Sequence, residues 1–326
     1  MLENPKDLIE VSALTRALNI FSDRWAFLIL RDAFRNVNRF GGFLESLGIP
    51  RQTLLTRLEM LADQKIIYKR PIKEGRIIFE YKLTPMGLDL YPYAVSIWQW
   101  YMCWFPEETV LDSSLKHKNC GHGLQVMMKC QACDGKVEMK DIAIEAGPGA
   151  GMDVRPTQRK GRRSWGMGPD AEAQRALSVV CDRWNNLILG AIFSNVQNFE
   201  AIQNSIGIAP NTLSDRLKTL VEMDILKPTR KNSGSRFASY IPTQKGLDFF
   251  PCLFELASWG NRWLMGWNGP AAIPIHKTCG DILHSKIVCA HCKQEIHPQD
   301  VVAGNAPKAN ILVDLVSIKK EKIHAN

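Results

Sequence analysis

Residues 16–30, RALNIFSDRWAFLIL, recur later in the chain as residues 175–189, RALSVVCDRWNNLIL. Subtracting 16 from 175 gives an offset of 159 residues, and at this offset the two stretches share the strings Arg-Ala-Leu, Asp-Arg-Trp and Leu-Ile-Leu. The sequence therefore indicates a tandem duplication of a whole domain, with no gap between the matched residues.

The match continues far downstream of these two stretches. Further pairs at the same offset are Gly48 with Gly207, Thr53 with Thr212, Arg57 with Arg216, Thr84 with Thr243, Trp100 with Trp259, and Trp104 with Trp263. Between the copies, residues 142–170 are rich in glycine and carry five lysine or arginine residues. We interpret them as a basic linker. Its charges either track phosphates as an arm or are simply solvated.

Hydrophobic periodicity within the first unit changes from helical to strand period and back. It predicts helices over 12–20, 24–36 and 40–48, and then a helix from Pro50 or Arg51 with an apolar stripe. The stripe is formed by Leu54, Leu58 and Leu61. Two short strands, 66–71 and 77–83, follow. A helix-turn-helix followed by a hairpin is a winged helix-turn-helix.

A further helix is expected after Thr84-Pro85, a cap and first-turn pair. Its tryptophans, Trp98, Trp100 and Trp104, form either core or subunit contacts or the lining of a ligand pocket. The expected fold class is α+β, mainly α, with two winged helix-turn-helix domains, each followed by a small zinc-ribbon-like module. The expected segments are 1–112, 113–141, the linker 142–170, 171–270, 271–303 and a tail 304–326.

Each unit also carries the spacing H-x2-C-x9-C-x2-C. The two sets are His117, Cys120, Cys130 and Cys133, and His276, Cys279, Cys289 and Cys292. Only six of the nine cysteines keep their positions at the 159-residue offset, and these six are all in the two sets. Such spacing is typical of structural zinc, so we predict one closed four-donor zinc site per unit. Disulfide-forming or redox-inert clusters, and iron in a rubredoxin-like cage, remain as alternatives.

Composition is that of an ordinary globular protein, with 326 residues, 45% apolar and 23% charged. No stretch approaches the roughly 20 apolar residues of a membrane span, and the N-terminal sequence does not resemble a signal peptide. We therefore expect a cytoplasmic protein with reduced thiols. The net charge of +8 permits an anionic partner such as DNA.

The face of the second helix opposite the leucine stripe holds the candidate DNA contacts. They are Arg51, Gln52, Thr53 and Thr56 in the first unit, and Asn211, Thr212, Asp215 and Lys218 in the second. Glutamine can pair with adenine, and threonine can contact a base edge or a thymine methyl. Because the leucines are kept and the outer residues differ, the two units are expected to prefer different half-sites or to bind with unequal strength.

Two further groups of basic residues are weaker candidates. Arg57 and Arg216 lie at the border of the apolar stripe, so each contacts a phosphate or forms an internal ion pair. The candidate wing contacts are Lys73, Arg76, Lys231 and Arg236.

The stretches 16–70 and 81–87, together with the diverged copy at 175–217, resemble the bacterial HxlR-type winged helix-turn-helix transcriptional regulators. The resemblance implies dimeric operator binding through the helix at 50–63 and its equivalent. Members that sense oxidants use a cysteine before the first helix, where this chain has Ser12 and Ala171, so thiol sensing is not expected there. Because members are usually homodimers of single units, the fused pair is expected to act as a single-chain pseudo-dimer or to dimerise again.

The predicted function is a transcriptional regulator that binds double-stranded DNA, with two structural Zn²⁺ ions. A small-molecule effector is compatible with this function, but nothing in the sequence identifies one. A zinc-stabilised protein interaction module is the alternative. A zinc enzyme would need an open coordination position and a neighbouring carboxylate motif, which are absent, so no enzyme is expected. Oxidation of the thiolates is a further hypothesis, because it could eject the zinc.

Overall fold

The computed structural model describes residues 13–72, 79–106, 114–149, 175–229, 239–264 and 269–303. Unit 1 comprises α2 (Ala13–Phe21), α3 (Arg24–Phe34), α4 (Phe40–Leu47), α5 (Arg51–Asp63), β1 (Ile67–Pro71), β2 (Phe79–Leu83), α6 (Pro85–Leu88) and α7 (Tyr91–Trp104). Unit 2 comprises α8 (Arg175–Val180), α9 (Arg183–Phe193), α10 (Phe199–Ile206), α11 (Pro210–Glu222), β6 (Leu226–Thr229), β7 (Ser239–Pro242) and α12 (Gln244–Trp263). The second unit thus repeats the order of the first.

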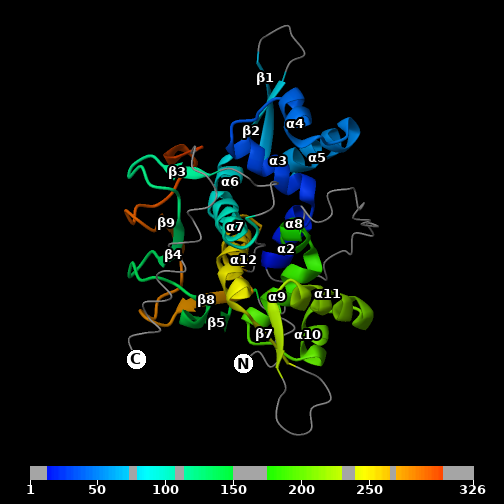
Figure 1. Ribbon diagram of the computed structural model, residues 1–326, viewed down its shortest axis with the longest axis vertical. Coiled ribbons are helices and arrows are strands. Elements are labelled where there is room, and N and C mark those ends of the chain that lie inside the picture. The colour runs from blue at the N-terminus through cyan, green and yellow to red at the C-terminus, as the bar shows by residue number, and fades with distance from the viewer. Residues whose placement is uncertain are drawn as a thin grey trace.

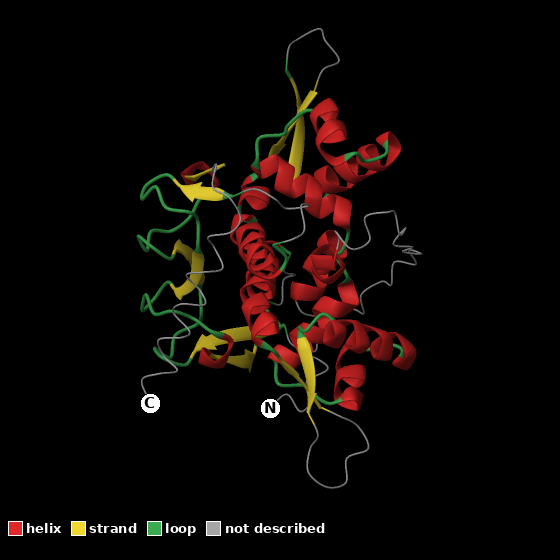
Figure 2. Cartoon of the chain, viewed as in Figure 1, coloured by secondary structure: helices red, strands yellow, loops and turns green. Residues whose placement is uncertain are grey.

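The remaining strands form what we call the strand layer, residues 114–149 and 269–303. Its elements are β3 (Leu115–His117), β4 (Val126–Cys130), η1 (Met139–Asp141), β5 (Ile142–Ala146), β8 (Ala272–His276), β9 (Ser285–Cys289), η3 (Pro298–Asp300) and β10 (Val301–Ala303). The strand layer lies along one edge of the molecule in Figure 1, α5 and α11 lie toward the opposite edge, and α7 and α12 lie between them. Figure 2 shows the same division, with helices on one side and the short strands of the layer on the other.

Local sequence signals set the ends of the helices. The Asp23 carboxylate caps α3 by accepting from the backbone N–H groups of Trp25 and Ala26 at 3.1 and 3.0 Å. Gly48 ends α4 in the left-handed conformation with φ 58°, where a side chain would be strained. Thr84 caps α6 by accepting from the Gly87 N–H at 3.1 Å. The expected helices and the expected Thr84 cap therefore form for reasons visible in the sequence, whereas the Asp23 cap was not predicted.

Helices α3, α4 and α5 pack as a helix-turn-helix, and β1 pairs with β2 as an antiparallel wing. The leucine stripe of α5, Leu54, Leu58 and Leu61, is buried to 1% exposure or less. In unit 2, α9, α10 and α11 pack in the same way, and β6 pairs with β7. These observations confirm the predicted fold class, which is mixed, mainly helical and built from two repeated helix-turn-helix regions.

The two units share one core through α7 and α12. The Trp100 indole N–H donates to the backbone carbonyl of Lys245 at 2.9 Å, and the Trp259 indole N–H donates to the carbonyl of Met86, also at 2.9 Å. Trp100 matches Trp259 and Met86 matches Lys245 at the 159-residue offset, so the two bonds are reciprocal. Both tryptophans are buried to 1% exposure or less, which makes them core contacts between units.

Helix α2 of unit 1 also packs on α12 of unit 2. The approach is so close that a Cβ atom added at Gly260 would lie 2.5 Å from the carbonyl oxygen of Ala13. The Phe21 ring meets the Trp259 ring edge to face, with 5.6 Å between their centroids. The two units of the chain therefore pack closely against each other.

In every strand pair of the layer, one strand comes from residues 114–149 of the first copy and the other from residues 269–303 of the second copy. Strand β4 pairs with β9, β3 with β10, and β5 with β8, all antiparallel. The prediction that residues 142–146 open the linker is wrong, because they form β5 and pair with Ala272–His276. The basic residues of the linker and the tail from 304 lie outside the described residues. No helix in the described part of the chain is long and apolar enough to cross a membrane.

We expect Trp100→Phe to lower the free energy of unfolding by about 1–3 kcal/mol, because it removes the buried hydrogen bond from the Trp100 indole to the Lys245 carbonyl. Trp104→Phe on the same helix is the matched control. Its indole N–H donates to the Asp248 carboxylate at an exposed position, 3.1 Å away, where water can replace it. Urea unfolding of both variants tests this, and equal losses would show that the buried bond has no special role.

Candidate metal centres and DNA-facing helices

The eight predicted metal ligands lie on four tight turns in the strand layer. The H-x2-C turn of unit 1 precedes β4 and the C-x2-C turn follows it, so the extended strand holds the two turns at its opposite ends. Five residues of strand span about 17 Å, which is too far for the four donors of one unit to meet at one ion. Antiparallel pairing with β9 places Cys130 opposite Ser285 and Val126 opposite Cys289. Each C-x2-C turn therefore lies beside the H-x2-C turn of the other unit.

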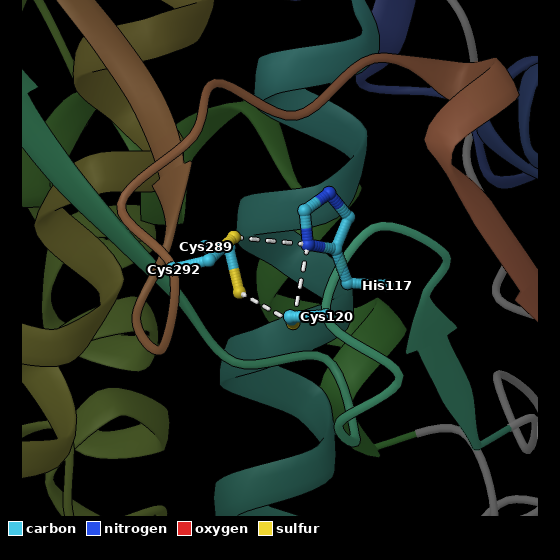
Figure 3. Close-up of side chains that lie close together, drawn as sticks. All are labelled: His117, Cys120, Cys289 and Cys292. Carbon is cyan, nitrogen blue, oxygen red and sulfur yellow. Dashed lines mark hydrogen bonds between the residues drawn. The ribbon is translucent and has the colours of Figure 1, made fainter.

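The structure accordingly gathers the donors into two mixed groups. One group is His117, Cys120, Cys289 and Cys292, and the other is Cys130, Cys133, His276 and Cys279. Figure 3 shows the first group, with the imidazole and three thiols from both units turned toward one another. The prediction that each unit closes its own site is therefore wrong. The same eight residues form two Cys3His groups that could hold a metal ion, each with two donors from each unit.

Distances within the groups fit a tetrahedral ion. In the first group, His117 Nδ1 lies 3.4 Å from Cys120 Sγ and 3.3 Å from Cys292 Sγ, and the Cys120 and Cys289 sulfurs are 3.8 Å apart. The matching sulfur distance in the second group is 4.0 Å, between Cys130 and Cys279. Zinc bond lengths require about 3.8 Å between two sulfurs and about 3.5 Å between nitrogen and sulfur. The donors are thus at ligand spacing.

The environment favours thiolates at two positions. The backbone N–H of Gln294 lowers the pKa of the Cys292 thiol. Burial raises the pKa of Cys130, but backbone N–H groups of Cys133 and Ala132 outweigh it and lower that pKa overall. Hydrogen bonds from backbone amides stabilise the charged sulfur, which is the form that binds metal.

The two imidazoles present Nδ1 to the sulfurs, and both rings are fully buried. Their Nε2 atoms have no hydrogen-bond partner among the described residues. All nine cysteines are free thiols, and Cys181 is buried at 1% exposure as a core residue of unit 2. The disulfide alternative therefore finds no support in the structure.

The candidate DNA contacts of unit 1 lie on the outer face of α5. Arg51, Gln52 and Thr56 are exposed, whereas Thr53 is half-buried beside the leucine stripe. The Thr56 hydroxyl donates to the backbone carbonyl of Gln52 at 3.0 Å. An open cavity of about 630 Å³ borders Arg51 and Gln52 and is also lined by Arg39 and Tyr81. This face of unit 1 thus combines exposed hydrogen-bonding groups with two guanidinium groups.

In unit 2, the outer face of α11 exposes Asn211, Asp215 and Lys218, and Thr212 is half-buried. Lys218 lies 3.8 Å from Glu222, one turn along the same helix. Helix α11 begins with a proline where α5 has Arg51. The two exposed faces therefore differ in charge and hydrogen-bonding groups, whereas the buried stripes are both leucine.

Arg57 and Arg216 form internal ion pairs, which was one of the two alternatives. The Arg57 guanidinium donates to both carboxylate oxygens of Asp23 at 2.9 and 2.8 Å, and Arg216 lies 3.1 Å from Asp182. Because Asp23 and Asp182 also cap α3 and α9, each pair ties the second helix of the motif to the start of an earlier helix. Sequence analysis missed this role, although the Asp and Arg recur together at the 159-residue offset.

The wing candidates Lys73, Arg76, Lys231 and Arg236 lie outside the described residues, as do Ser12 and Ala171. The strands that flank the wing of unit 1 are described, and they expose Lys69 and Arg70. Arg70 pairs with Glu80 on the neighbouring strand, so its charge is partly neutralised. Unit 2 has Pro228 and Thr229 at the matching positions.

A family model described as HxlR-like helix-turn-helix matches residues 20–109 and again residues 179–267, which together make up more than half of the chain. The chain belongs to the HxlR-like helix-turn-helix family. The two matched regions coincide with units 1 and 2, which confirms the tandem duplication. Family and fold are those of HTH-type transcriptional regulators.

Individual relatives align with about one unit of this HxlR-like protein. Rv3095 of Mycobacterium tuberculosis, named an uncharacterized HTH-type transcriptional regulator, is 35% identical over 140 residues, covering 43% of this chain and 89% of the relative. The similarly named sll1512 of Synechocystis is 26% identical over 100 residues, covering 30% and 74%. PA1374 of Pseudomonas aeruginosa, a solved structure of a candidate transcription factor, is 27% identical with a TM-score of 0.31, covering 43% and 97%.

Behind the strand layer, α12 of the HxlR-like chain carries an unusual carboxyl group. Glu255 is 2% exposed, and its Oε1 has no hydrogen-bond partner among the described residues. Burial raises its pKa to about 7, although the Ser285 side chain and, after it, Arg262 oppose the shift, and Asp89 and Glu295 add to it. The charged form of this side chain is therefore disfavoured in the folded protein.

The free energy of unfolding should accordingly decrease as pH rises. Because the pKa of Glu255 is about 7 in the folded state and about 4.5 when unfolded, stability falls between these pH values and stays low above pH 7. We expect Glu255→Gln to remove this pH dependence. The free energy of unfolding of the variant minus that of the wild type should therefore be about 3 kcal/mol larger at pH 8 than at pH 4.5. Urea unfolding at fixed metal concentration measures the difference. Glu222→Gln, at an exposed position, is the control and should leave the dependence unchanged.

Proposed function

We propose that this HxlR-like chain is a sequence-specific DNA-binding transcriptional regulator whose two units, within residues 1–112 and 171–270, read adjacent half-sites. The observation that carries the proposal is the pair of outer helix faces. Helices α5 and α11 each bury a leucine stripe and leave their other face exposed, and both lie toward the same edge of the molecule in Figure 1. An exposed second helix of this motif is the element that enters a major groove.

The half-sites are expected to differ in sequence. Gln52 of unit 1 suits adenine, and Asn211 at the matching position can make a similar pair. Asp215 replaces Thr56, and a carboxylate accepts from cytosine N4 but is repelled by phosphates. Selection from random duplexes should therefore return an asymmetric site. A perfect palindrome would contradict this part of the proposal.

Zn²⁺ is the proposed ion for both Cys3His groups. Three thiolates and one imidazole form a donor set typical of structural zinc, and their spacing matches the edges of a zinc tetrahedron. Four protein donors would leave no open position for a reacting water, so the ion would supply folding free energy and no chemistry. The residues that would hold it are the eight already named.

Purified protein should contain two zinc ions per chain by elemental analysis. Removing them with a chelator should lower the thermal unfolding temperature, because binding free energy to the folded layer is then lost. Readdition of zinc should restore both the content and the unfolding temperature. A metal content near zero in reduced protein, or iron in place of zinc, would contradict the assignment.

We expect Gln52→Ala to weaken binding to the selected site by about 5- to 150-fold, because one bidentate base contact is lost. It should also relax sequence preference at a single base pair. Gln299→Ala is the matched control, since this exposed glutamine lies in the strand layer on η3. Fluorescence anisotropy over a range of salt concentrations measures affinity, and affinity should fall steeply with added salt as counterions are released.

The alternative is a zinc-stabilised module that binds another protein. Absence of any sequence-selective complex in the same titration would favour that alternative, as would equal effects of Gln52→Ala and Gln299→Ala.

A further inference from the structure

Both metal centres bridge the two units of the chain. Each takes one H-x2-C turn from one unit and one C-x2-C turn from the other. The backbone crosses in the same places, because the Ala290 N–H donates to the Gln125 carbonyl at 2.7 Å and the Gln131 N–H donates to the His284 carbonyl at 2.8 Å. Metal ions bound here would therefore cross-link residues that are far apart in sequence.

The strand layer also rests on the helices that join the units. Strands β4 and β9 both contact α7, and the Val126 N–H donates to the Gln99 side-chain oxygen of α7 at 3.0 Å. Met128 of β4 and Ile287 of β9 are each 2% exposed within the common core. The layer thus packs on α7, one of the two helices that join the units.

We propose that the two metal centres are staples that fix the relative position of the two DNA-binding units. The α7–α12 interface joins the units through packing and the reciprocal tryptophan bonds, and the metal-held layer restrains the same helix pair from a second side. Without metal, the turns at the ends of the short strands lose the ion that would link their donors, and small metal modules seldom stay folded unaided. The helix pair then regains freedom to shift.

The arrangement also makes the two centres depend on each other. Strand β4 ends in a donor turn of one centre and begins after a donor turn of the other, and β9 does the same. If one ion is lost, one end of β4 and one end of β9 are no longer held by a metal centre. The ligand positions of the remaining ion are then less well ordered, so its affinity should fall even though all four of its donors are intact.

The consequence for DNA rests on the proposed function. Two units held at a fixed separation bind two half-sites with a high effective concentration, which falls when the separation is no longer fixed. Metal removal should therefore weaken binding to the two-half-site duplex by at least about 10-fold, while binding to a duplex with one half-site changes by less than about 2-fold. Metal occupancy would thus affect the separation between the two units and not the recognition of bases by each unit.

The direct test measures the distance between the units in the full chain. Asp63 and Glu222 are matched exposed residues near the ends of α5 and α11, and spin labels on genetically encoded amino acids at these positions leave the cysteines untouched. With zinc bound, pulsed electron resonance should give one narrow distance distribution. After chelation the distribution should broaden, and added zinc should restore it. An unchanged distribution in zinc-free protein would overturn the proposal.

A single-donor variant tests the staple where complete chelation unfolds the chain. Cys133→Ser removes one exposed ligand of one centre. We expect zinc content to fall below one ion per chain at a zinc activity that fills both centres of the wild type, with a broadened distance distribution. Cys103→Ser, at a cysteine outside both groups, is the control and should keep two ions.

If Cys133→Ser keeps one ion at wild-type affinity and a narrow distribution, the centres are independent and the staple is wrong. Because zinc content and distance are measured without DNA, this failure is distinct from a failure of the proposed function. Conversely, the distance between the units could depend on metal while no sequence-selective DNA complex forms. That result would support the staple proposal and contradict the proposed function.

Discussion

The antiparallel pairing of β4 with β9 is the constraint on which the arrangement of this chain depends. Met128 and Ile287 face each other at the centre of this pair and are also matched residues of the duplication. A local twofold axis therefore passes between them. The same axis relates β3–β10 to β5–β8, one Cys3His group to the other, and the Trp100 bond to the Trp259 bond. The register of this strand pair thus determines how the metal donors are grouped, and the helical interface follows the same twofold symmetry.

This symmetry explains which parts of the molecule tolerated change. Several residues whose partner lies in the other copy are kept at the offset, among them the metal donors and the two buried tryptophans. So are Asp23 with Arg57, and Asp182 with Arg216, which join two helices within a unit. Exposed positions on the outer faces of α5 and α11 differ between the copies, as at Thr56 and Asp215.

Much of the fold could be predicted because it depends on local chemistry. Helix periodicity, the Asp23 and Thr84 caps and the left-handed Gly48 are determined within a few residues of themselves. The duplication supplied the choice of metal donors by elimination. Assigning the donors to particular ions was beyond sequence reasoning, because the same eight residues satisfy zinc whether they are grouped within or between units. The grouping of the donors is decided by the length and direction of β4, and these are fixed only once β4 is paired with β9.

The start of the linker was missed for a related reason. Residues 142–146, IAIEA, alternate weakly and lie next to a glycine-rich run, so composition favoured a linker. Their partner is β8, which lies about 130 residues away, at 272–276. Strand formation there is set by the cross-unit ladder and not by local propensity, which is commonly overruled by tertiary context.

Fusion of the two copies has a physical consequence that a homodimer cannot share. In a homodimer every substitution appears twice, so a change such as Thr56 to aspartate would alter both half-site contacts at once. In one chain each recognition face can change alone, and no bimolecular step limits assembly because the second unit is always present. The eight candidate metal donors gain no such freedom, since each Cys3His group takes two donors from each copy. Linking the copies thus separates a surface that can diverge from an interior that must remain symmetric.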